Sequence, residues 1–63
     1  MNHLQLCSTV LELTNGDFQA AIYALECGEF LASMGMTDDD QDVVELAHDD
    51  LKRAHNLLQV LRK

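Results

Sequence analysis

The sequence predicts an all-α protein, an antiparallel helical hairpin with a short N-terminal helical segment. Three observations predict this class. The 63 residues include no proline and are rich in residues that favour helix, such as leucine, alanine and glutamate. Apolar residues recur at the three- and four-residue steps of a helical face. Aromatic residues make up 5 % of the chain and β-branched residues are scattered, which is untypical of a sheet protein.

Residues 3–14 form the short N-terminal helix of this prediction, with Leu4, Cys7 and Leu11 on one face. Two alternatives stay open. The three-four spacing continues through Gly16, as in one bent helix that carries a glycine costing about 1 kcal/mol against alanine. Leu4 and Leu6 also alternate as in a strand, although the alternation does not persist.

Residues 17–35 are expected to form the central helix, around which the chain is organised. Asn15-Gly16 breaks the chain before it, Asp17 is a suitable N-cap, and Gly35 is a suitable C-terminal cap. At about 100° per residue, its polar side chains form one narrow stripe. The rest of its surface is apolar on two opposite flanks, and one partner helix cannot cover both.

Residues 38–61 are expected to form the last helix. Thr37 is a suitable N-cap, and Asp40 occupies the position of a capping-box acid. The helix is amphipathic, except that Asp50 projects within its apolar stripe. Three interpretations of Asp50 stay open: its carboxylate snorkels to water, it meets a basic partner such as His3 or a lysine, or it lies at a gap in an interface.

A single hairpin of these two helices leaves one flank of the central helix bare. We therefore expect a homodimer close to a four-helix bundle. The alternative is that the N-terminal helix folds back in the same chain and covers that flank. The expected dimer core consists of Phe18, Ile22, Leu25, Cys27, Leu31, Val43, Ala47, Leu51 and Leu58.

The charge distribution points to a protein partner rather than to nucleic acid. The net charge is −7, all 11 acidic residues lie between Glu12 and Asp50, and all 4 basic residues lie in the last dozen positions. Such a body repels phosphate, so direct nucleic-acid binding is not expected. Solubility and the positive end of a helix dipole account for many of these acids. The expected partner surface is Glu45, Asp49, Asp38 and Asp39.

No pattern in the sequence predicts catalysis, a metal site or a cofactor, and we expect the protein not to be an enzyme. Glu45 and His48 have the Glu-x-x-His spacing of di-iron bundles, with Glu26 or Glu29 as a neighbouring ligand, but Glu45 lies on the face turned away from the core. Histidines 48 and 55 have no ligand four residues away.

The two cysteines form no Cys-x-x-Cys pair, and we interpret Cys7 and Cys27 as small buried hydrophobes. The sequence shows no signal peptide and no apolar run of about 20 residues. A cytoplasmic location with reduced thiols and no membrane partner is therefore expected.

The whole chain, including the acidic segment TDDDQDVVELAHDDLKRAHNLLQVLRK, resembles a small early protein of lambdoid bacteriophages encoded between the exonuclease and excisionase genes. The resemblance implies expression early in infection, in the host cytoplasm, and an effect on host physiology or on the choice between lysis and lysogeny. No site residue follows from it. We expect a non-enzymatic regulatory protein that binds a host or phage protein. The alternative is an acidic nucleic-acid mimic that inhibits a DNA-binding enzyme.

Overall fold

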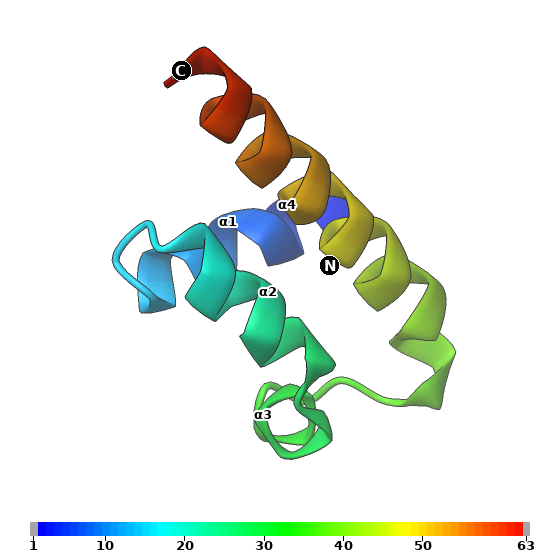
Figure 1. Cartoon of the computed structure of the whole chain (residues 1–63). Coiled ribbons are helices and arrows are strands. Elements are labelled where there is room, and N and C mark those ends of the chain that lie inside the picture. Colours follow the sequence, from blue (N-terminus) through cyan, green and yellow to red (C-terminus); the bar gives the residue numbers. More distant parts are fainter. Residues whose placement is uncertain (1, 63) are drawn as a thin grey trace.

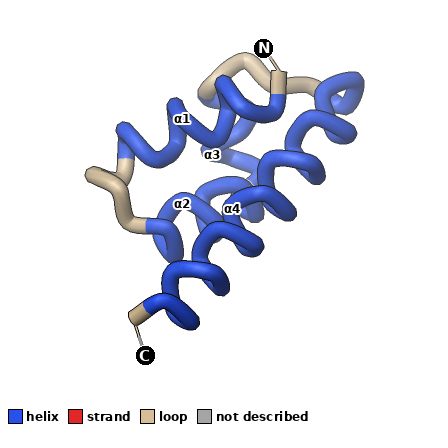
Figure 2. Tube along the Cα trace, turned by 90° about the horizontal axis from the view of Figure 1, so that it is seen from above, coloured by secondary structure: helices blue, strands red, loops and turns tan. Residues whose placement is uncertain are grey.

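The computed structural model describes residues 2–62, and every regular element in this range is a helix (Figure 1). Helix α4 is the longest, and both α1 and α2 pack against it (Figure 2). The elements are α1 (His3–Leu13), α2 (Phe18–Glu26), α3 (Gly28–Ser33), the 3-10 turn η1 (Asp38–Asp40) and α4 (Gln41–Leu61).

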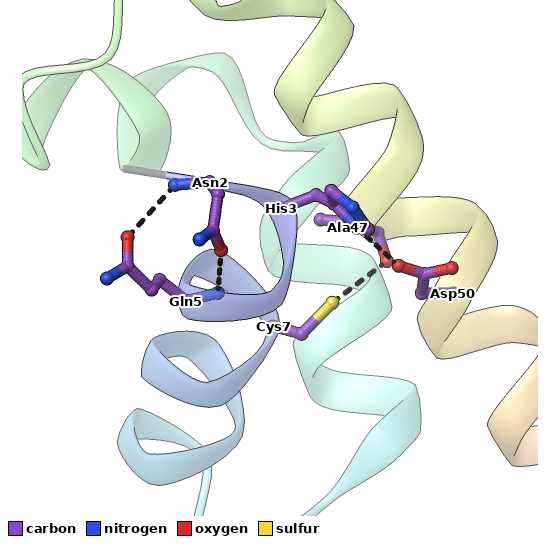
Figure 3. Close-up of polar contacts among 6 residues, drawn as sticks. All are labelled: Asn2, His3, Gln5, Cys7, Ala47 and Asp50. Carbon is purple, nitrogen blue, oxygen red and sulfur yellow. Dashed lines mark hydrogen bonds and ion pairs between the residues drawn. The ribbon is translucent and has the colours of Figure 1, made fainter.

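Helix α1 begins in a reciprocal cap. The Asn2 side chain accepts a hydrogen bond from the backbone N–H of Gln5 at 2.8 Å, and the Gln5 side chain accepts one from the Asn2 N–H at 3.0 Å (Figure 3). Each bond satisfies a backbone donor that has no partner inside the helix. Residues 3–13 are thus a separate helix, neither a strand nor a continuation of the central one.

The turn from α1 to α2 is fixed by left-handed backbone at Asn15 (φ +57°) and Gly16 (φ +80°). The Gly16 N–H donates to the Leu11 carbonyl at 2.7 Å, which closes the end of α1. Asp17 then caps α2 by accepting a hydrogen bond from the Ala20 N–H at 3.1 Å. The Asn-Gly pair thus reverses the chain within a few residues.

The expected continuous helix over 17–35 is wrong, because the chain breaks at Cys27. This residue has extended backbone (φ −95°, ψ 108°) and is both the C-cap of α2 and the N-cap of α3. Gly28, a poor helix former, follows it. The break changes the direction of the chain, and Phe30, Leu31 and Met34 then pack against the core. Burial of these side chains offsets the helical hydrogen bonds lost at the break.

Helix α4 is reached through a third left-handed residue, Gly35 (φ +82°), after which the Met36 N–H donates to the Leu31 carbonyl at 3.0 Å. Asp40 accepts a hydrogen bond from the Thr37 N–H at 2.9 Å, as its capping-box position predicts. The expected helix over 38–61 begins as the 3-10 turn η1 and becomes α-helical at Gln41.

The core lies where α1, α2 and α4 meet. Three residues of the expected dimer core, Leu25, Ala47 and Leu51, are buried there within a single chain. Phe18, Ile22, Leu31 and Val43 are half-buried against it, whereas Cys27 and Leu58 are half-buried outside this cluster. Among the residues that the structure describes, the buried core consists of Leu6, Cys7, Val10, Ala21, Leu25, Ala47 and Leu51.

Helix α1 supplies three of these residues and covers the flank of α2 that was expected to need a second chain. Leu6 and Val10 are the largest side chains with no exposed surface. The alternative in which the N-terminal helix folds back in the same chain therefore describes the structure. Cys7 is buried as expected and its thiol donates to the Ala47 carbonyl at 3.4 Å.

Asp50 meets His3, one of the three interpretations left open by its position. The Asp50 carboxylate accepts a hydrogen bond from His3 Nδ1 at 2.7 Å (Figure 3). Both side chains are about one-third exposed, so water screens the pair and its contribution to stability is modest. Its structural effect is to hold the first turn of α1 against the middle of α4.

Replacing Leu6 by alanine tests whether α1 is part of the core. Leu6→Ala should lower the free energy of unfolding by about 2–5 kcal/mol, because it removes a fully buried side chain and leaves a cavity. Leu4→Ala is the matched control, since Leu4 is 64 % exposed on the same helix, and it should change stability by less than about 0.5 kcal/mol. Urea denaturation followed by circular dichroism measures both. Equal effects would contradict the packing of α1.

Candidate protein-binding groove

A groove of about 410 Å³ lies between α3 and the beginning of α4. The break at Cys27 produces it, because it turns α3 away from the line of α2 (Figure 1). Leu25, Leu31, Met36 and Val44 line the groove with apolar surface. Its complete lining is Leu25, Gly28, Leu31, Ala32, Met36, Thr37, Asp38, Gln41, Val44 and Glu45.

A second depression of about 360 Å³ continues this groove along α4. The two share Leu25, Val44 and Glu45, so they form one connected surface, which we call the α3–α4 groove. The second part adds Glu26, His48 and Asp49. In size, each part is within the range of ordinary ligand sites, about 300–1,000 Å³.

The rim of the α3–α4 groove is acidic. Asp38 and Glu45 border its first part, and Glu26, Glu45 and Asp49 border its second. These four acidic residues are all exposed to solvent. Among the described residues that line either part, none is lysine or arginine. The groove therefore combines apolar surface with a negative potential that no lining cation offsets.

Three of the four residues expected to meet a partner border this groove: Asp38, Glu45 and Asp49. Asp39 is exposed but does not line it. Of the apolar lining, Leu25 and Leu31 were expected in a dimer core and Met36 and Val44 were assigned to no binding surface, because the groove forms only when α3 and α4 come together. Gly28 was the one local signal, since a glycine inside an apolar helical run marks a weak point.

The end of α2 approaches the middle of α4 at this site. Glu26 Oε2 lies 3.5 Å from His48 Nε2, a nitrogen that is buried and makes no hydrogen bond within the described structure. Closer to the start of α2, the Phe18 and His55 rings lie 6.3 Å apart between centroids. Along this contact, later residues of α4 therefore lie beside earlier residues of α2.

The residues considered for metal binding do not assemble into a site. Within residues 2–62, no three histidine, cysteine, aspartate or glutamate side chains are grouped as a metal ion requires. Glu26 approaches His48, but Glu45 borders the groove without completing a ligand set. No helix in the same range has the length and apolar character needed to cross a membrane.

The two cysteines differ in environment. Burial, with the negative charge of Asp50 as a smaller cause, raises the pKa of the Cys7 thiol above its ordinary value. Cys27 is half-buried at the helix break, which corrects the expectation that both thiols are buried. Both cysteines are free.

Comparison with protein-family models, curated proteins and solved structures finds no match to this chain.

The raised pKa of Cys7 predicts a pH dependence of stability. The folded chain holds the thiol proton more tightly than the unfolded chain, so this contribution to stability is fully present below the pKa of the unfolded thiol and is lost as the pH rises above it. Between neutral and alkaline pH, the wild type should therefore lose more unfolding free energy than Cys7→Ala. Urea titrations at a series of pH values measure this difference. Parallel curves for the two proteins would contradict the environment described for Cys7.

Proposed function

We propose that this protein is a small, non-enzymatic regulatory protein that acts by binding another protein through the α3–α4 groove. The observation that supports the proposal most directly is the combination of apolar surface with an acidic rim formed by Asp38, Glu45 and Asp49. Apolar surface supplies affinity by leaving water, and the rim supplies orientation and charge selection.

The partner chemistry that fits this surface is a basic amphipathic helix. Its apolar face would lie against Leu31, Met36 and Val44, and its lysine or arginine side chains would reach the rim carboxylates. The resemblance to early phage proteins implies that such a helix belongs to a host or phage protein. Its capture would modulate host physiology or the choice between lysis and lysogeny.

Apolar surface between the acids favours a protein ligand over the alternative of a nucleic-acid mimic. A mimic needs carboxylates at regular spacing on an extended surface and gains nothing from Leu31 or Met36. Asp40, moreover, caps η1 rather than standing free, since it accepts a hydrogen bond from the Thr37 N–H. The acids near the start of α4 thus have partly structural roles.

A synthetic amphipathic helix with a leucine face flanked by lysines is the probe for this proposal. It should bind the wild type, with an affinity that falls as salt is added. Reversing the rim charges in Glu45→Lys/Asp49→Lys should weaken binding by about tenfold or more, because like charges then face each other. Fluorescence anisotropy of the labelled peptide gives the dissociation constants.

The matched control is Glu12→Lys/Glu29→Lys, which changes the net charge equally at exposed residues that line neither part of the groove. This control should retain most of the affinity. Absence of peptide binding to the wild type, or an equal loss in the two double variants, would overturn the assignment of the groove.

A further inference from the structure

Helix α4 carries exposed apolar residues that the core does not use. Leu46, Leu57 and Val60 are 50 %, 60 % and 65 % exposed. With Asp50 and Arg53 they follow steps of four, three, four and three residues, the spacing of a continuous helical contact surface. We call these five residues the α4 stripe.

The α4 stripe lies on a different side of the helix from the core. At about 100° per residue, the stripe is centred about 120° around the helix from the midpoint of buried Ala47 and Leu51. Val44 and Glu45, which line the α3–α4 groove, lie on the other side of that core direction. The rim residue Asp49 flanks the stripe, about 60° from its centre, so a partner on the stripe leaves the apolar lining of the groove open but lies beside one of its acids.

The order of residues along the α4 stripe is complementary to itself in the antiparallel direction. A twofold axis midway along it, between positions 51 and 52, places Leu46 opposite Leu57 of a second copy. The same axis places Asp50 opposite Arg53, and by symmetry this pairing occurs twice. An isologous interface requires this kind of self-complementarity.

We propose that a second copy of this chain binds the α4 stripe, giving an antiparallel homodimer with apolar pairs at its ends and two Asp50–Arg53 ion pairs at its centre. Asp50 already binds His3 through Oδ2, but an ionised carboxylate has further acceptor sites, and the side chain is about one-third exposed. It accepts the guanidinium of the second copy without releasing His3.

Charge along α4 selects the antiparallel arrangement. A parallel pair would place Asp50 against Asp50 and Arg53 against Arg53, which is repulsive at both layers. The antiparallel pair also sets the acidic beginning of α4, around Asp42, beside the basic end that contains Arg62 of the second copy. This local complementarity opposes the repulsion between two chains of net charge −7.

Sedimentation equilibrium of charge-reversed variants tests the interface. The wild type should be a dimer, and Arg53→Glu should raise the dimer dissociation constant by at least about tenfold, because both central ion pairs become repulsive. Lys52→Glu makes the same charge change at the neighbouring exposed position outside the α4 stripe, and it should remain dimeric. A monomeric wild type at its highest soluble concentration, or equal weakening by the two variants, would overturn the proposal.

Disulfide trapping tests the orientation. In a Cys27→Ala background, Leu46→Cys and Leu57→Cys chains oxidised separately should stay uncrosslinked, whereas their mixture should give a covalent heterodimer. Crosslinking of either chain with itself, or none in the mixture, would contradict the antiparallel register. The variants that test the dimer leave the residues lining the α3–α4 groove unchanged. The peptide titration therefore tests the groove separately, and either the dimer or the groove proposal can fail without the other.

Discussion

Burial of Leu6 and Val10 is the constraint on which the rest of the structure depends. A chain of 63 residues has little interior, and these are the largest side chains wholly removed from solvent. They come from α1, which packs on α2 and α4 (Figure 2). The Asn2 cap, the left-handed Asn15-Gly16 turn and the His3–Asp50 contact hold α1 there. With α1 in place, Ala21 and Leu25 are buried within the single chain.

This packing of α1 on α2 and α4 leaves α4 with three surfaces of different character. Ala47 and Leu51 face the core, Val44 and Glu45 face the α3–α4 groove, and Leu46 and Leu57 are exposed. Only the first of these is needed to fold the single chain. The other two carry apolar area that a lone subunit would leave in water, so each offers free energy of burial to a binding partner.

Local signals in the sequence predicted the helix caps well. Asp17, Gly35 and the Thr37–Asp40 pair act as their positions suggest, since each bond is made within a few residues. The break at Cys27 was not predicted, because its gain comes from tertiary contacts of Phe30 and Leu31. Periodicity also shows that a face must be covered without showing which segment covers it. Three of the four acids expected to meet a partner border the groove, while most of its apolar surface emerged only from the fold.

The break at Cys27 has a consequence for how the groove works. Among residues 2–62, the backbone of α3 lies close to that of α2 and of no other helix, although its side chains also reach the core (Figure 1). Segments with few neighbours open at a lower free energy than the core. The groove wall is thus adjustable, and a helix bound there as proposed would have to immobilise it, which would lower affinity but would admit helices of different diameters. Such tolerance suits a protein that engages several targets better than one built around a single rigid fit.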